Sequence, residues 1–404
     1  MRITNHHNYI FIVVLGLLSS FQALGQQSKK DSLPKLHITY GNKGFEMRSE
    51  DNKYLLQIQS RLQFRFATPN DTDPLTLDDF NQDENNLFKI NRARLKVGGH
   101  AYQPWLKYYW EYDVSQSNLL DWRVMVEKWK WLKLKVGQWK IEYSRERRIS
   151  SGAQQMVDRS LLNRHFTVDR QQGVELYGRL DGNGMLDFSY WAAMLTGTGR
   201  GSRTNDDNNL MYFARLQWNM LGEDLGFKSS DLSIHKTPEA IIAVAAVTNE
   251  SPYTRFSSSG GGALTGFESM EDGQYRINQL NIESAFVYRG FSWQSEFHQK
   301  EIIDHENNDA TTNMIGYYAQ AGYLAHQALD WWPAPLEIAA RYSHYNPDRS
   351  ILANNLQEAS LAFNWFFKGH RNKLTLECSA FDYETPEMKI DNRMRFRLQW
   401  DVSF

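Results

Sequence analysis

The last eleven residues of the chain, Met394 to Phe404, place apolar and polar side chains in strict alternation. The apolar positions are Met394, Phe396, Leu398, Trp400, Val402 and Phe404. Successive side chains of a β-strand point to opposite faces, so this stretch predicts a strand with one wholly apolar face and one charged face. Such an apolar face must be covered either by the core of a soluble β-protein or by lipid.

The N-terminus indicates that the chain is exported. Residues 1–25 resemble a secretory signal, because Arg2 precedes an apolar run from Tyr9 to Leu18 and a possible cleavage site at Ala23 to Gly25. The apolar run of about ten residues is too short to span a bilayer as a helix. We therefore expect residues 1–25 to be removed, with a short polar segment at 26–53 and a folded domain at 54–404.

Composition narrows the class further. No later stretch of about eighteen uncharged apolar residues exists, and the mean hydropathy is -0.59, which excludes a bundle of transmembrane helices. A membrane β-barrel passes this test because its apolar residues occupy every second position. Aromatic residues make up 14% of the chain, as expected for a barrel with aromatic girdles. The net charge of -2 gives no indication of nucleic-acid binding, and the single Cys378 allows no internal disulfide.

Alternation and turn signals predict sixteen strands. They are expected at residues 54–66, 87–98, 105–115, 121–128, 131–139, 172–180, 185–195, 209–219, 240–249, 275–289, 291–301, 313–325, 335–345, 355–367, 372–383 and 392–404. The even number puts both ends on one side of the membrane, and the long connections then gather on the other side. The predicted fold is all-β, a transmembrane antiparallel β-barrel. The connection at 220–239 breaks the pattern, so it is either a real excursion on the short-turn side or a sign of two miscounted strands.

If the apolar faces meet lipid, the opposite faces line the lumen. The basic residues expected there are Arg61, Arg65, Arg92, Arg94, Lys96, Arg123, Lys133, Lys135, Arg393, Arg395 and Arg397. Guanidinium groups stay charged and present a planar fork of donors to phosphate or carboxylate oxygens, and rows of them are used in anion and phosphate pores. Some of these arginines would instead pair across strands with Glu111, Asp113, Glu127 or Asp401.

The third long connection, 140–171, is the richest in charge. It holds Arg145, Arg147, Arg148, Arg159, Arg164 and Arg170. A connection of this length without a strand pattern is usually functional, although its charges could simply keep an outer loop solvated. Residues 150–162 are expected to form a short helix with an apolar side toward the wall. Folded inward, this third outer loop would narrow the pore and bring its arginines to the constriction.

At this point the chain resembles the phosphate-selective porins of the O and P type. The likeness is carried by GFEMRSED (44–51) leading into 56–66, by NRARLKVGG (91–99), and by KVGQWK (135–140) followed by SS (150–151), DRS (158–160) and GVELYG (173–178). The resemblance implies a sixteen-stranded barrel, usually a trimer, with an inward third loop and arginines along the anion path. Two departures concern the permeant: Ile141 to Tyr143 lack a proline that many members have there, and no dense lysine cluster occurs on the outer loops.

The sequence thus predicts a porin of the Gram-negative outer membrane that passes phosphate-like anions by passive diffusion, with no enzymatic activity, cofactor or metal. The expected anion contacts are Arg61, Arg65, Arg92, Arg94, Arg123, Arg147, Arg148 and Arg159. Expected partners are outer-membrane lipids, the barrel-assembly machinery acting on Phe404, and two further copies of the chain in a homotrimer.

Three alternatives stay open. A general or sugar porin would use aromatic side chains on the lumen face, for which Tyr109, Tyr177 and Phe213 have the right parity. An outer-membrane barrel enzyme would need a nucleophile and a base held together, whereas the histidines are scattered along the chain. These histidines are His165, His298, His305, His344 and His370. A soluble secreted β-protein is the third alternative.

Overall fold

The computed structural model describes residues 35–72, 79, 85–182, 184–201, 204–257, 261–267 and 270–404. The predicted signal at 1–25 lies outside these residues, so the division into signal, polar segment and folded domain stays a prediction. Within the described part, no helix combines the length and the apolar character needed to cross a lipid bilayer.

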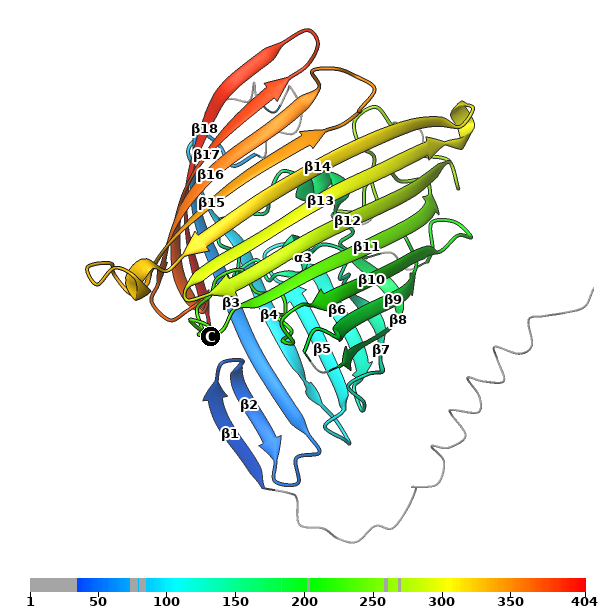
Figure 1. The fold of residues 1–404 in the computed structure, drawn as a ribbon. Helices are drawn as coiled ribbons and strands as arrows, with labels where there is room; N and C mark the ends of the chain where they lie inside the picture. The colour runs from blue at the N-terminus through cyan, green and yellow to red at the C-terminus, as the bar shows by residue number, and fades with distance from the viewer. Residues whose placement is uncertain are drawn as a thin grey trace, which may run out of the picture.

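Sixteen antiparallel strands, β3 to β18, form one closed ring in which β18 pairs with β3. Figure 1 shows how these strands surround the interior. They are β3 (Leu55–Thr68), β4 (Leu87–His100), β5 (Leu106–Asp113), β6 (Asn118–Val126), β7 (Lys133–Lys140), β8 (Arg170–Asp181), β9 (Asp187–Leu195), β10 (Met211–Asn219), β11 (Glu239–Ser251), β12 (Tyr275–Tyr288), β13 (Phe291–Asp304), β14 (Ala310–Tyr323), β15 (Leu336–Asn346), β16 (Asn355–Phe366), β17 (Asn372–Glu384) and β18 (Lys389–Ser403). Each of the sixteen predicted strands has its counterpart, and the barrel prediction is confirmed.

The ring closes where the last strand pairs with the first strand of the barrel. β18 runs antiparallel to β3, with Trp400 opposite Phe64. At the end of the chain the amide of Phe404 donates to the carbonyl of Ser60 at 2.9 Å, and the amide of Ser60 donates back at 3.1 Å. The alternation at Met394 to Phe404 therefore belongs to the closing strand.

A two-stranded hairpin precedes the barrel, where the sequence analysis predicts no strand. β1 (Leu36–Gly41) pairs with β2 (Gly44–Ser49), and β2 pairs with the first residues of β3, Leu55 to Ile58. Figure 1 shows the hairpin projecting beyond the end of the barrel wall. Strands of six residues are shorter than a membrane-spanning strand, so a search for membrane-length alternation passes over them.

The barrel is apolar outside and charged inside. Along β6, Trp122 and Val124 are 60% and 46% exposed. Arg65 on β3 and Arg397 and Asp401 on β18, which alternate with exposed apolar residues, are at most 3% exposed. In a soluble protein the apolar side chains are buried and the charged ones are exposed. The opposite arrangement here fits a barrel whose outer face meets lipid.

The long connections lie at one end of the barrel and most short ones at the other. The connection between β10 and β11, residues 220–238, is the long one at the short-turn end. Since no strand was miscounted, it is a real feature of the fold. Several of its residues are buried: Leu225, Ser229, Ser230 and Asp231 are all at most 5% exposed.

An apolar cluster stands among these polar interior groups. It joins residues of the β7–β8 connection, such as Ile141, Leu162 and Phe166, to buried residues of the strands from β9 to β17. Its members are all less than 10% exposed. Apolar side chains of the β7–β8 connection therefore pack against apolar side chains of the barrel strands.

Candidate functional site

The connection between β7 and β8, residues 141–169, carries two helical turns. They are α3 (Arg145–Arg148) and α4 (Leu162–Phe166). Ser144 caps α3, because its hydroxyl oxygen accepts a hydrogen bond from the amide of Arg147 at 3.1 Å. Such a cap satisfies one of the amides that a helix start leaves without a partner.

The short helix expected over residues 150–162 is not formed. Two of its backbone amides are bound by carboxylates on distant strands instead of by carbonyls one turn earlier. The amide of Val157 donates to Glu377 on β17 at 2.7 Å, and the amide of Leu161 donates to Glu358 on β16 at 3.2 Å. Met156, Val157 and Leu161, the apolar residues that suggested a helix, are buried although the segment is irregular.

Further hydrogen bonds tie the connection to other parts of the ring. The guanidinium of Arg61 on β3 donates to the hydroxyl of Ser151 at 2.6 Å. The amide of Arg145 donates to Glu283 on β12 at 3.1 Å. The side chain of Gln155 donates to Glu337 on β15 at 2.8 Å. One connection therefore contacts strands from both halves of the barrel.

Beside this connection lies a small cavity of about 200 Å³ with a strongly basic lining. Its eleven lining residues are Arg92, Arg94, Gln116, Lys140, Arg147, Ser151, Arg159, Asp169, Arg170, Arg200 and Ser257. Seven of them are basic and one is acidic. Four of the eight arginines expected as anion contacts meet here: Arg92, Arg94, Arg147 and Arg159. We call this space the arginine cavity.

Several of the basic groups are held by carboxylates. Arg94 on β4 bonds to Glu111 at 3.0 Å and to Asp113 at 3.2 Å, both on β5. The Nε atom of Arg147 donates to Asp169 at 2.9 Å. These pairs fix the guanidinium planes in position, because an arginine held by carboxylate oxygens loses its rotational freedom.

Two basic groups of the arginine cavity have no carboxylate partner among the residues that the structure describes. Arg159 donates through Nε and Nη2 to three backbone carbonyls, those of Glu146, Arg147 and Ile149, at 2.9 to 3.3 Å. Burial, with the nearby charges of Arg147 and Arg92, lowers the pKa of Arg159 below its ordinary value. The ammonium of Lys140 has no side-chain partner in the described ranges. An excess of positive charge therefore remains in the cavity.

The other four predicted arginines lie outside the cavity lining. Arg61 contacts Ser150 and Ser151, Arg65 pairs with Asp71 and Asp158, Arg123 pairs with Asp121, and Arg148 pairs with Glu142. The cross-strand pairing that the sequence analysis held open occurs instead for Arg94, with Glu111 and Asp113 on the neighbouring strand. Arg61 remains close to the cavity, since its partner Ser151 lines it.

Three of the basic lining residues were not among the expected anion contacts: Lys140, Arg170 and Arg200. Arg170 belongs to the charged connection, so its position gave a signal. Lys140 occupies the same alternating position as the outward-facing residues of its strand. It is nevertheless buried, as are Trp139 and the residues that follow. Arg200 lies in a separate connection, and nothing in the sequence links it to this site.

The residues named for the alternative functions have other contacts. The hydroxyl of Tyr109 donates to Glu111 at 2.9 Å, and that of Tyr177 donates to Glu127 at 2.7 Å. Phe213 belongs to the apolar cluster. Across the described ranges, no three His, Cys, Asp or Glu side chains are grouped as a metal ion would require.

A closed sixteen-stranded ring with a lipid-type outer face and a charged interior defines an outer-membrane channel protein. Solved structures agree with this class. The chain superposes on the trimer form of OmpT, an outer-membrane protein of Vibrio cholerae, with a TM-score of 0.57 at 8% identity, covering 86% of this chain and 99% of that one. The outer-membrane channel DcaP of Acinetobacter baumannii gives 0.54 at 11%, covering 88% and 99%. Salmonella typhi OmpF in complex with daunomycin gives 0.53 at 10%, covering 89% and 100%.

The family is shown by sequence. The profile of the phosphate-selective porin O and P family matches residues 62–401, and the chain belongs to that family. No curated protein matches the chain at a significant level. The protein is accordingly a porin, located in the outer membrane of a Gram-negative bacterium, and the predicted family and location are confirmed.

Proposed function

We propose that this porin conducts small anions in preference to cations, and that the arginine cavity is where a phosphate-like oxyanion binds during passage. The observation that carries the proposal is the excess of basic groups around a space of about 200 Å³, with Arg159 and Lys140 lacking a carboxylate partner. Anion pores use rings of Arg or Lys in this way.

The chemistry of the lining fits an oxyanion. Guanidinium groups donate in a planar fork that matches phosphate oxygens, whereas an ammonium acts as a point charge. In Arg159 the atoms Nε and Nη2 are bonded to backbone carbonyls, while Nη1 makes no hydrogen bond to the described residues. A bound anion would accept from that atom and would relieve the repulsion among Arg159, Arg147 and Arg92.

We further propose that the β7–β8 connection crosses the interior and forms the constriction of the channel. Its hydrogen bonds reach β3 through Ser151 and β12 through Arg145, and these strands stand on opposite walls of the ring. Contacts with both walls support a position of the arginine cavity on the path of a permeating anion. The contacts of Tyr109, Tyr177 and Phe213 leave no row of free rings that would favour a sugar track.

The first test is the reversal potential of single channels in a potassium chloride gradient, with phosphate then added. We expect a chloride-selective potential and a block by phosphate. Lys140→Gln removes one unpaired charge, worth about 1 kcal/mol at 4 Å even in water, so the ratio of anion to cation permeability should fall roughly fivefold. The matched control is Lys133→Gln on the same strand, away from the cavity. Cation selectivity of the wild type, or equal effects of both variants, would overturn the proposal.

Assembly is the remaining part of the proposed function. We propose a homotrimer, supported by family membership and by the fold shared with OmpT, which is described in a trimer form. We also propose that the assembly machinery reads Phe404, whose side chain is half exposed at the barrel seam. Cross-linking in native membranes should give a threefold mass, and Phe404→Ala should reduce the amount of barrel that reaches the outer membrane.

A further inference from the structure

A second cavity lies at the end of the barrel that carries the long connections. It has a volume of about 570 Å³ and is walled by α4, by residues 264–267, by the start of β14 and by the connection from β15 to β16. A space of this size falls within the range of small-molecule sites, roughly 300–1,000 Å³. We call it the mouth cavity; it shares no lining residue with the arginine cavity.

The lining of the mouth cavity is largely uncharged. Among its fifteen lining residues Asp348 is the one carboxylate, and neither Lys nor Arg occurs. The apolar wall includes Phe267, Met314, Tyr345 and Leu356. The lining offers an anion no basic group, so we expect a ligand class different from that of the arginine cavity.

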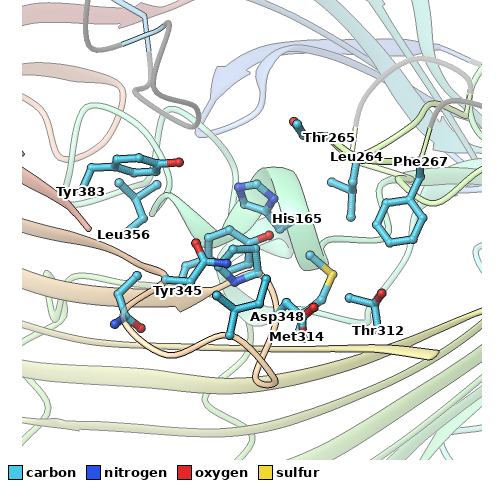
Figure 2. A pocket seen from close by; sticks show the side chains of 15 residues that line it. His165, Leu264, Thr265, Phe267, Thr312, Met314, Tyr345, Asp348, Leu356 and Tyr383 are labelled. Atoms are coloured by element: carbon cyan, nitrogen blue, oxygen red, sulfur yellow. The ribbon is translucent and has the colours of Figure 1, made fainter. Parts of the chain in front are cut away.

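His165 on α4 is the central polar group of the mouth cavity. Figure 2 shows its imidazole over the ring of Tyr345, with Phe267 on one side and Leu356 and Tyr383 on the other. The two rings are stacked, with centroids 3.9 Å apart and planes at 19°. The backbone of His165 is also held in place, because its carbonyl accepts a hydrogen bond from the ammonium of Lys300 at 3.0 Å.

The two ring nitrogens of His165 have no hydrogen-bond partner among the described residues, although the side chain is only 8% exposed. A buried polar atom left in this state costs free energy, and such atoms usually have a partner. Burial, together with the charges of Lys300, Arg164 and Arg255, lowers the pKa of His165 to about 3. The imidazole is therefore neutral at pH 7 and offers one donor and one acceptor.

We propose that the mouth cavity binds an uncharged single-ring molecule with an apolar face and a hydroxyl on its edge, a phenol-type compound. The hydroxyl exchanges hydrogen bonds with the imidazole of His165. The ring packs against Phe267, Met314 and Leu356, the apolar part of the wall. This site does not depend on the anion selectivity proposed above, because the two cavities have separate linings.

The probe for the test is 4-methylphenol, whose hydroxyl resembles that of tyrosine and stays protonated at pH 7. Binding to the refolded full-length barrel in detergent micelles is measured by titration calorimetry. Uptake into micelles is measured with protein-free micelles and subtracted. The test variant is His165→Phe, which keeps a ring on Tyr345 and removes both nitrogens. We expect saturable binding of one probe per chain by the wild type and binding about tenfold weaker in His165→Phe, the equivalent of one hydrogen bond.

Two further measurements make the outcome decisive. Phe267→Ala removes an apolar side chain from the wall of the mouth cavity and should also weaken binding of the probe. Trp400→Leu, on the lipid-facing side of β18, is the control and should leave binding unchanged. 4-Methylanisole, which lacks the hydroxyl proton, should bind at least about tenfold more weakly than the phenol. Equal uptake by the wild type, His165→Phe and Phe267→Ala would overturn the site, and equal affinity for the two probes would overturn the ligand class. Neither result bears on ion selectivity, which is measured by current.

Discussion

The amide nitrogen of Val157 donates to the carboxylate of Glu377 at 2.7 Å, a bond between residues 220 positions apart in the chain. Glu377 is also paired with Arg397 on β18. A single buried carboxylate therefore holds the β7–β8 connection and joins β17 to the closing strand.

Glu377→Gln should destabilise the barrel. The amide side chain keeps an oxygen that can accept from Val157, but it removes the nearest carboxylate from the buried Arg397. Breaking a buried pair from one side costs about 3 kcal/mol or more. We expect the free energy of unfolding to fall by that amount, measured by urea titration of the barrel in lipid vesicles. Glu387→Gln, on the exposed connection to β18, is the control and should change nothing. A loss below about 1 kcal/mol would contradict the anchoring role.

Arg159→Lys separates charge from geometry in the arginine cavity. Lysine keeps the positive charge, but one ammonium cannot bond to three backbone carbonyls and also present a fork to an oxyanion. We expect the reversal potential in potassium chloride to stay close to that of the wild type, while the phosphate concentration that halves the current rises about tenfold. The control is Arg179→Lys, whose partner Asp187 lies near the short-turn end, 2.8 Å from its Nε. An unchanged phosphate block would show that Arg159 does not contact the anion.

The β7–β8 connection should loosen in acid. Asp158 is bonded to Arg65 at 2.6 Å and lies near Arg92 and Arg397. Burial acts to raise the pKa of Asp158, but these three cations outweigh it and hold the pKa well below its usual range. A depressed folded-state pKa gives stability that is complete above the unfolded value, about 3.9, and is lost as the pH falls through the folded value.

The melting temperature should therefore be level from about pH 7 to pH 5 and fall below about pH 4. Asp158→Asn should have a lower melting temperature at neutral pH and a smaller acid dependence. A wild-type protein whose melting temperature is unchanged down to pH 2, or an Asp158→Asn variant with the full acid dependence, would contradict this assignment.

Arg145 joins the β7–β8 connection to the connection between β10 and β11. Its guanidinium donates to the carbonyls of Gly226 and Lys228, both at 2.7 Å, in the connection between β10 and β11. Hydrogen bonds to a charged group contribute about 1.5–3 kcal/mol each. Arg145→Met should free the 220–238 connection, so trypsin should cut after Lys228 at least about tenfold faster. Cleavage after Arg349, on the opposite end, serves as the internal reference and should keep its rate.

The barrel can be predicted from the sequence because each strand carries its own alternation of apolar and polar residues and this pattern repeats from strand to strand. Alternation such as that of Met394 to Phe404 depends on one strand at a time, and an even number of strands orders the connections. The interior is different. The helix expected over 150–162 fails because Glu377 and Glu358, far along the chain, bind the amides that the helix would have used. Lys140 is likewise buried, and the alternation of its own strand does not predict this.

The hairpin before the barrel has a consequence for closure. β2 occupies the edge of β3 at Leu55 to Ile58, Phe404 bonds to Ser60, and β18 covers the same edge from Arg61 to Thr68. The closing strand therefore ends where β2 already occupies the edge of β3. A slip of one residue would turn every charged side chain of β18 toward lipid. The hairpin limits how far β18 can pair along β3 and so fixes the register between these two strands. Because β2 and β18 together pair with Leu55 to Thr68, a neighbouring chain cannot add a strand to this edge of β3.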